Sequence, residues 1–265
     1  MSGKWPDYST LLLEYVEPGI LVVALNRPQS LNAVSRQMLE DLKDLWQRLK
    51  YDMDTRVVIL RGSGDKGFCG GVDVREQGTD DILKVPGMFE YQRQLSDLQL
   101  QMRTIPQPII CLVQGAAAGA GFSFSLASDI RIITPEARFS AFYINVGLGG
   151  ADMGSSYFLP RLIGAGRAYE FLLTGRFMNA EEAMNLGFAS RCVPKAELMN
   201  NALELARLMT AKDPIAIRLT KEAINMNLDC AGLEAGLAME NRNQVMMVMH
   251  NVTKGTGEIW GNKTI

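Results

Sequence analysis

Short, mostly apolar runs separated by helical patterns are the feature that most constrains how this chain can fold. Four of these runs are predicted strands: Ile20 to Leu25, Val57 to Arg61, Ile109 to Val113 and Asp129 to Ile133. Several are too uniformly apolar for a sheet with one face in water, so we expect burial on both faces. Alternation of such strands with helices predicts an α/β core with right-handed crossovers.

Two stretches between the predicted strands have the apolar spacing of amphipathic helices. The first helix has one apolar face, which consists of Met38, Leu39, Leu42, Leu45, Trp46 and Leu49. The second has Leu95, Leu98, Met102 and Ile105. Each helix has one face to bury, and the predicted sheet offers the surface for it.

Composition excludes several classes of function. With 265 residues, 47% of them hydrophobic, the chain can form one large domain, or one domain with an appendage. A net charge of −2 gives no electrostatic reason to expect nucleic acid or a membrane surface as a partner. The apolar runs are too short to span a membrane, and the first residues lack a signal-peptide pattern. We expect a soluble cytoplasmic protein, or one of the mitochondrial matrix or peroxisome in a eukaryote.

The cysteines and the single histidine narrow the possible chemistry. Cys69, Cys111, Cys192 and Cys230 are widely spaced and form no CxxC, which argues against a zinc site or a disulfide framework. A metal cage or Ser-His-Asp triad built on histidine would have to use His250. We therefore predict no metal site, and expect His250 to have a structural or interface role.

The last third of the chain is predicted to be helical. Asn179 and Glu182 have the spacing of a capping box, and Asp213 followed by Pro214 starts another helix. A third helix is predicted from about Leu233 to His250. Its methionines and those of the preceding helix offer more adaptable apolar surface than a small helical appendage needs, which favours a subunit interface over internal packing alone.

The segment Gln114 to Asp129, QGAAAGAGFSFSLASD, has the composition of an anion or oxyanion site. Its small residues let backbone approach a ligand, and the free N–H groups of the following helix would point at that ligand. Two other glycine clusters, Lys66 to Val74 and Gly147 to Ser156, also follow predicted strand regions, so the three can converge at one end of a sheet. None fits a nucleotide-binding fingerprint, and GxSxG is absent.

Five ordered motifs give the chain a resemblance to a known family. They are NRPQSLNAVS at Asn26 to Ser35, GFCGGVDV, the Gln114 to Asp129 segment, GLGGADMGSSYFLPRLIG, and LLTGRFMNAEEAMNLGFASRCVP. Over roughly residues 10 to 225 the chain resembles the enoyl-CoA hydratase/isomerase, or crotonase, superfamily. The resemblance implies a spiral of ββα units over residues 1–198 and a helical trimerisation region over residues 199–265, assembled as a homotrimer or a dimer of trimers.

The same resemblance implies where an acyl-CoA thioester would bind. Its oxyanion would accept hydrogen bonds from the backbone N–H groups of Val72 and Ala120, which would stabilise a thioester enolate. The residues expected to contact CoA are Gln29, Ser30, Leu31, Val72, Asp73, Val74 and Arg75. For Asp73 we favour a structural role in ordering its turn. CoA is part of the substrate, and no further cofactor is expected.

The departures from the family pattern concern the catalytic side chains. Resembling hydratases have glutamates at the positions of Ser123 and Tyr143, and neither hydroxyl is a base at neutral pH. Asp152 matches an acid that dienoyl-CoA isomerases use in proton transfer, in a loop that is one residue longer here. The alternative is that Asp152 caps a helix beginning near Gly154. Tyr143 either donates a hydrogen bond to substrate or packs, and Ser123 has a structural role or holds a water.

Three functions remain open at this point. The leading one is an enzyme in which Asp152 moves the proton, giving enoyl-CoA isomerisation or an atypical hydration or dehydration. A noncatalytic acyl-CoA-binding protein is the second, and a serine hydrolase using Ser123, Asp152 and His250 is a remote third. The stretch Gln77 to Phe89 is expected to shape the acyl pocket, whereas the tail GTGEIWGNKTI departs from the basic tail that contacts CoA in relatives.

Overall fold

The computed structural model describes residues 5–76 and 85–254, and divides the chain into two compact units, Met1–Thr210 and Ala211–Ile265. Most of the stretch expected to shape the acyl pocket, and all of the atypical tail, lie outside the described residues. The division falls after Thr210 rather than after residue 198, because helix α7 (Leu198–Thr210) packs against three strands of the first unit.

A six-stranded sheet forms the centre of the first unit. Its order is β1 (Leu11–Glu17), β2 (Ile20–Leu25), β3 (Val57–Gly62), β5 (Ile109–Val113), β7 (Ile130–Ile133) and β10 (Arg191–Cys192). Strands β1 and β2 pair antiparallel, and the remaining pairs are parallel. The four predicted strands are confirmed as β2, β3, β5 and β7, whereas β1 and β10 were not predicted.

A second, smaller sheet was also not predicted. Its order is β4 (Gly67–Cys69), β6 (Ala116–Ala118), β8 (Arg138–Ser140) and β9 (Met178–Asn179). The first three strands run parallel, and β9 pairs antiparallel with β8. Strands of only two or three residues are too short for an apolar periodicity to be recognised in the sequence.

The chain winds through both sheets in repeated units. In each unit one strand of the large sheet is followed by one strand of the small sheet and then by a helix: β3–β4–α2 (Val85–Thr104), β5–β6–α3 (Ala120–Ala127) and β7–β8–α4 (Ser155–Ile163). A short 3-10 helix, η3 (Phe142–Val146), precedes α4. The predicted α/β class and its ββα units are thus confirmed.

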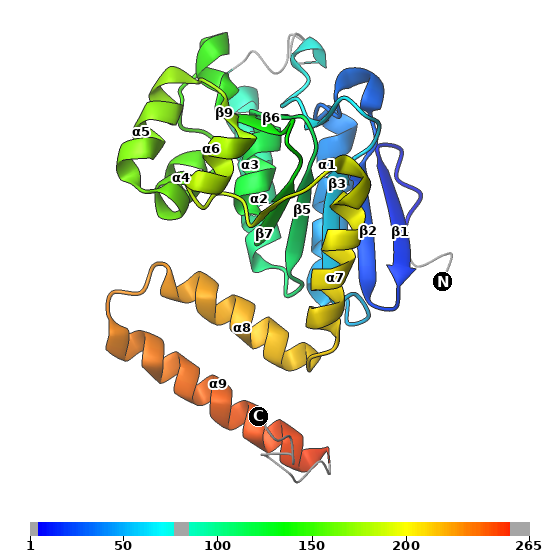
Figure 1. Ribbon diagram of the computed structural model, residues 1–265, viewed down its shortest axis with the longest axis vertical. Helices are drawn as coiled ribbons and strands as arrows, with labels where there is room; N and C mark the ends of the chain where they lie inside the picture. The colour runs from blue at the N-terminus through cyan, green and yellow to red at the C-terminus, as the bar shows by residue number, and fades with distance from the viewer. Residues whose placement is uncertain (1–4, 77–84, 255–265) are drawn as a thin grey trace. The chain divides into compact units, whose positions relative to one another are not determined.

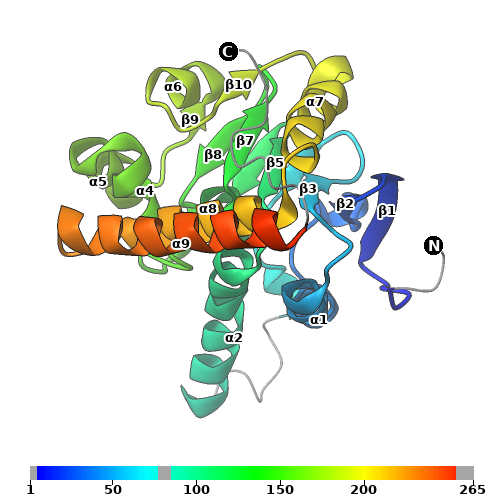
Figure 2. The same cartoon turned by 90° about the horizontal axis from the view of Figure 1, so that it is seen from below.

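The large sheet is buried on both faces, as its apolar strands predict. Along β2, Leu21, Val23 and Leu25 belong to one apolar cluster, and Ile20 and Val22 to the other. The alternation follows from the two-residue period of a strand. Helices α1 (Arg36–Tyr51) and α2 lie on one side of the strands and α7 on the other, as Figure 2 shows.

Several shorter elements complete the first unit (Figure 1). They are η1 (Pro28–Ser30), η2 (Val74–Glu76), α5 (Ala165–Thr174), α6 (Ala180–Asn185) and η4 (Lys195–Glu197). The predicted capping box is present, because Asn179 Oδ1 accepts from Glu182 N at 2.8 Å and Glu182 Oε2 accepts from Asn179 N at 3.1 Å. It fixes the start of α6.

The second unit is a pair of helices, α8 (Pro214–Asn227) and α9 (Leu233–Thr253). Asp213 caps α8 by accepting from Ile215 N at 2.8 Å, as predicted. Its carboxylate also accepts from His250 Nε2 at 3.2 Å and Lys254 Nζ at 2.9 Å. Partial burial opposes ionisation, but the Lys254, Ile215 and His250 hydrogen bonds outweigh it and lower the pKa of Asp213 to about 2. His250 therefore links the end of α9 to the start of α8.

No helix within residues 5–76 and 85–254 is long and apolar enough to cross a membrane.

Arg131 fastens the C-terminal end of α3. Its guanidinium donates to the carbonyls of Ser125, Ser128 and Phe188 at 3.1, 2.7 and 2.5 Å. Burial lowers the pKa of Arg131 to about 10, so the group stays charged at neutral pH. A cation at this end of a helix complements the helix dipole and satisfies carbonyls that have no partner within the helix.

Replacing this buried arginine tests how strongly it fastens α3. Arg131→Met keeps much of the volume but leaves three carbonyls without their donors, and each costs about 1–3 kcal/mol. We expect the free energy of unfolding, measured in urea, to fall by at least about 3 kcal/mol. Arg167→Met, at a surface ion pair in α5, should change it by less than about 0.5 kcal/mol. If both substitutions lowered the free energy of unfolding equally, the proposed role of Arg131 in stabilising the end of α3 would be contradicted.

Candidate active site

Three neighbouring parallel strands of the small sheet end at the same edge, and each leads into one of the predicted site segments. Strand β4 leads into Gly70 and Gly71, β6 into Gly119, and β8 into η3, which carries Tyr143. Carboxyl ends of parallel strands are where α/β proteins place ligands. The predicted convergence of the glycine clusters is therefore explained by a sheet that the sequence did not reveal.

The two glycines before the predicted oxyanion donors lie against each other. Gly71 has φ 113° and Gly119 has φ 52°, values that L side chains rarely adopt. A Cβ at Gly119 would lie 3.5 Å from Cα of Gly71, and one at Gly71 would lie 3.3 Å from the Ala118 carbonyl oxygen. The backbone segments that precede Val72 and Ala120 are thus in direct contact.

The N–H group of Val72 faces away from the neighbouring chain segment. Val34 N donates to Gly71 O at 2.8 Å, and Asp73 N donates to Val34 O at 2.9 Å. These two bonds form a parallel bridge between Val34 and Val72. Successive backbone N–H groups point to opposite sides in extended chain, so the N–H of Val72 points away from Val34.

Ala120 supplies a helix N-terminus. It is the first residue of α3, whose backbone bonding begins with Ser123 N donating to Gly119 O at 3.0 Å. The N–H groups of a helix's first turn have no acceptor within the helix, and the helix dipole favours negative charge beside them. All eight residues of α3 are buried, which keeps water from competing along its length.

Gly121 lets α3 pack directly on β4. A Cβ at this position would lie 2.2 Å from the Cys69 carbonyl oxygen and 2.7 Å from Cys69 Cβ, both impossible approaches. Because Gly121 has no side chain, the helix that carries Ala120 can pack directly against the strand that leads to Val72.

Ser123 and Tyr143 form a buried hydroxyl pair. Their oxygens lie 2.9 Å apart, and both side chains are almost completely buried. Burial, aided by the charge of Asp152, raises the pKa of Tyr143 to about 12, although hydrogen bonds with Ser123 and Ser155 oppose the shift. Tyr143 is therefore neutral at pH 7, and can donate a hydrogen bond but cannot act as a base.

Asp152 is half-buried beside this pair. Tyr143 Oη donates to the Asp152 carbonyl at 3.4 Å, and Asp152 Oδ1 accepts from Met153 N at 2.7 Å and from Gln92 Nε2 at 2.5 Å. Burial raises the pKa of the carboxyl, and the hydrogen bonds from Met153 and Gln92 partly offset this. An acid with a raised pKa is suited to proton transfer nearer neutrality.

The helix-capping alternative for Asp152 is wrong. The N-cap of α4 is Gly154, in a left-handed conformation, and no side chain caps the helix. Asp152 contributes only its backbone, whose carbonyl accepts from Ser155 N at 2.9 Å and whose N–H donates to Ser155 Oγ at 3.1 Å. Its carboxyl is thus not used to start α4.

The two predicted CoA-contacting segments are neighbours. Gln29 and Ser30 lie in η1, and Gly70 N donates to the Leu31 carbonyl at 2.8 Å, which joins this loop to the turn leading to Val72. Leu31 and Val74 are 42% and 65% exposed, so apolar side chains stand open to a ligand on both segments. Gln29 and Arg75 are also exposed.

Asp73 has the contacts of a turn-ordering residue. It is 8% exposed, and its carboxylate accepts from Arg27 Nη1 at 3.0 Å and from Arg75 N at 3.3 Å. Arg27 Nη1 also donates to the Ala33 carbonyl at 2.7 Å. Asp73 and Arg27 together connect the two segments that are predicted to contact CoA, which agrees with the structural role favoured for Asp73.

Gln92, Ser155 and Arg27 were not predicted as site residues. Gln92 lies on α2 and reaches Asp152 across sixty residues of sequence. No local pattern distinguishes this glutamine from others on α2, because its role depends on how α2 is placed. Arg27 had a better signal, since it stands within the motif NRPQSLNAVS.

The residues of the remote hydrolase hypothesis have other partners. Ser123 is hydrogen-bonded to Tyr143, and His250 to Asp213 within the second unit. A nucleophilic serine needs a base in hydrogen-bonding reach. Neither contact provides that arrangement.

Comparisons with known proteins agree with the geometry. Residues 16–259 match the family model described as Enoyl-CoA hydratase/isomerase. A Mycobacterium tuberculosis protein named "Probable enoyl-CoA hydratase EchA12" is 36% identical over 251 residues, covering 93% of this chain and 88% of that protein. The 1,2-epoxyphenylacetyl-CoA isomerase of Escherichia coli is 33% identical over 215 residues, covering 81% of each.

A solved structure also indicates the enoyl-CoA hydratase/isomerase family. The crystal structure of an enoyl-CoA hydratase from Bacillus anthracis superimposes with a TM-score of 0.85 at 33% identity, covering 91% of each chain. The chain that has these two sheets and the contacting glycine turns therefore matches one family over residues 16–259. The protein belongs to the enoyl-CoA hydratase/isomerase family.

Proposed function

We propose that this protein is an acyl-CoA-processing enzyme that stabilises a thioester enolate and isomerises a double bond, with Asp152 moving the proton. The single observation that carries the proposal is the set of side chains beside the glycine turns. Among the residues that the structure describes, Asp152 is the acid whose backbone contacts the neutral pair Ser123 and Tyr143, while the Asp73 carboxylate is bound to Arg27.

The backbone supplies the stabilisation of the enolate. The N–H of Val72 points away from Val34, and the N–H of Ala120 opens a buried helix. Both follow the contacting glycines Gly71 and Gly119. Two such donors would bind the thioester oxygen more strongly as negative charge develops on it, and removal of one typically costs about 10²–10³ in rate.

A single carboxyl is sufficient for isomerisation. The Asp152 carboxylate takes a proton from carbon, the C–H electron pair forms the enolate, and the same carboxyl returns the proton to another carbon. Hydration needs a second group to position and activate water, and Tyr143, with a pKa of about 12, cannot be that base. An atypical hydration or dehydration through Asp152 alone is the secondary possibility. The similarity to a named isomerase of Escherichia coli supports the first choice.

CoA would lie along the joined segments, with Gln29, Ser30 and Leu31 on one side and Val72 to Arg75 on the other. The contact between Gly70 and Leu31 supports this placement. CoA is part of the substrate, and the proposed reaction uses no other cofactor.

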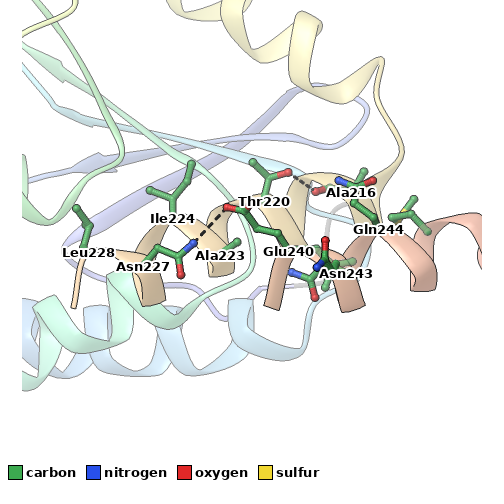
Figure 3. A pocket seen from close by; sticks show the side chains of 12 residues that line it. Ala216, Thr220, Ala223, Ile224, Asn227, Leu228, Glu240, Asn243 and Gln244 are labelled. Carbon is green, nitrogen blue, oxygen red and sulfur yellow. Dashed lines mark hydrogen bonds between the residues drawn. The ribbon is translucent and has the colours of Figure 1, made fainter. Parts of the chain in front are cut away.

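We also propose that the second unit assembles copies of the chain into a homotrimer or a dimer of trimers. This unit exposes many large apolar side chains: Ile224, Met226, Leu228, Leu233, Leu237, Val245, Met246, Val248, Met249 and Val252. It also leaves a groove of about 780 Å³, lined by α8 and α9, in which Asn227 donates to Glu240 (Figure 3). Apolar surface of this extent is typical of an interface.

The first test removes the charge of the proposed proton carrier. Asp152→Asn should reduce isomerisation of enoyl thioesters, and α-hydrogen exchange in deuterium oxide, by about 10²–10⁴. The dissociation constant for a saturated acyl-CoA, measured by calorimetry, should stay nearly unchanged because the backbone donors remain. Asp97→Asn, at an exposed position of α2, is the matched control and should behave as wild type. Tight binding without exchange in the wild type itself would instead support the noncatalytic homologue.

The second test moves one backbone donor. Gly121→Ala forces α3 from β4, which should displace Ala120, lower turnover about 10²-fold, and lower stability by about 1–3 kcal/mol. Gly166→Ala in α5 meets open space and should leave turnover unchanged, with stability raised by up to about 1 kcal/mol. Steady-state kinetics and urea unfolding measure both effects. Full turnover in Gly121→Ala would rule out the proposed hole.

The third test concerns assembly. Met249→Glu places a charge on the exposed apolar surface of α9 and should shift the protein, in light scattering after size exclusion, from trimers toward smaller species. Met53 is 68% exposed, against 64% for Met249, but lies in the first unit, so Met53→Glu should not change the mass. A monomeric wild type at micromolar concentration would refute the proposed assembly.

A further inference from the structure

The two oxygens of the Asp152 carboxyl have different surroundings. Oδ1 accepts from Met153 N at 2.7 Å and from Gln92 Nε2 at 2.5 Å. Within the described part of the chain, the side-chain hydrogen bonds of this carboxyl all go to Oδ1. A carboxylate oxygen offers two lone pairs, so two N–H donors fill its capacity.

The first of these donors is fixed by the backbone. Met153 has φ 46°, a left-handed conformation that is uncommon for a residue other than glycine, and its side chain is 3% exposed. The buried side chain anchors the strained residue, and its N–H stays on Oδ1. Rotation of the carboxyl to exchange its oxygens would break this bond.

The second donor comes from another element. Gln92 stands on α2 and is partly buried, and its amide reaches the carboxyl from the side of the helix. An amide cannot titrate, and two N–H donors on one oxygen leave the other as the place where a proton can bind without displacing a hydrogen bond.

We propose that Gln92 is a positioning residue that, with Met153 N, reserves Oδ1 for hydrogen bonds and directs the transferred proton to Oδ2 of Asp152. This inference rests on the proposed function, in which Asp152 moves the proton. In the forward step the substrate C–H bond breaks, its electron pair forms the enolate and the proton binds Oδ2. In the return step the proton leaves Oδ2 for another carbon. Both hydrogen bonds to Oδ1 persist throughout.

Gln92 also sets how readily the carboxyl ionises. A hydrogen bond donated to a carboxylate favours the charged form, which opposes the effect of burial. Of the described residues that contact Asp152 from other elements, Tyr143 on η3 has a pKa of about 12, and Ser155 on α4 is neutral. Glu90 and Arg93, the charged residues nearest Gln92 on α2, are exposed. A change at Gln92 should therefore act on Asp152 alone.

The experiment compares Gln92→Met and Gln92→Glu with the wild type. Gln92→Met keeps the length of the side chain but removes the donor, so the pKa of Asp152 should rise by about one pH unit. Gln92→Glu adds a second carboxyl beside the first, and the rise should be larger. Gln94→Met, two residues along α2 at a side chain that contacts Lys43 and Glu90, is the matched control and should cause no shift.

Two readouts separate this inference from the proposed function. One is the pH profile of hydrogen exchange into an acyl thioester, whose acidic limb should move up by the same amount as the pKa. The other is the carbon-13 NMR titration of aspartate carboxyls, in which Asp152→Asn identifies the signal, and it needs no turnover. If neither the wild type nor any variant exchanged hydrogen while the NMR shifts were as expected, the proposed function would be refuted, and only the effect of Gln92 on the ionisation of Asp152 would stand.

The opposite result overturns the inference alone. Normal exchange in the wild type, with the same Asp152 titration and pH profile in all Gln92 variants, would show that the glutamine does not act on the carboxyl. A purely structural role would lower stability equally in Gln92→Met and Gln92→Glu and leave the titration in place. The expected order of pKa values, wild type below Gln92→Met below Gln92→Glu, is specific to the proposed contact.

Discussion

The contact between the backbones of Gly71 and Gly119 is the constraint on which the rest of the site depends. Both glycines have φ values that L side chains rarely adopt, and a Cβ at Gly71 would also lie within 3.3 Å of the Ala118 carbonyl oxygen, so a side chain at either position would strain the contact between the two turns. With both side chains absent the two turns lie in contact, and we propose that the next residue of each, Val72 and Ala120, directs its N–H group to one substrate oxygen. The direction of one N–H follows from the parallel bridge to Val34, and that of the other from the start of α3. The directions of these two N–H groups thus depend both on local backbone conformation and on the topology of the sheet.

The position of α3 is fixed at both ends. At its start, Gly121 lets the helix rest on the backbone of β4, and at its end Arg131 holds carbonyls that the helix cannot satisfy itself. A helix of eight residues has little stability of its own, since most helical stability in proteins comes from packing. Its complete burial and these two anchors hold it in place, and the proposed oxyanion site would benefit because donors that need no rearrangement stabilise developing charge most effectively.

Much of this could be read from the sequence, and the reasons for the exceptions are physical. Runs such as Ile109–Val113 have the length and composition of buried strands, and Asn179 with Glu182 gives an unambiguous helix start. The small sheet escaped prediction because strands such as Ala116–Ala118 carry no apolar alternation. Gln92 escaped because its contact with Asp152 depends on the placement of a whole helix, which no local pattern encodes. Polar contacts between residues far apart in the sequence could therefore not be predicted.

The hydroxyl pair beside Asp152 has a consequence for how the site titrates. Two carboxyls in one buried site share their protons, so neither has a pKa of its own. Ser123 and Tyr143 fill the neighbouring space with a neutral hydrogen-bonded pair, and Tyr143 does not ionise until about pH 12. Among the described residues this pair adds no second acid beside Asp152, whose proton affinity is raised by burial and lowered by the hydrogen bonds from Met153 and Gln92. One carboxyl that takes a proton from carbon and returns it is what the proposed double-bond isomerisation would need, since that reaction adds no water.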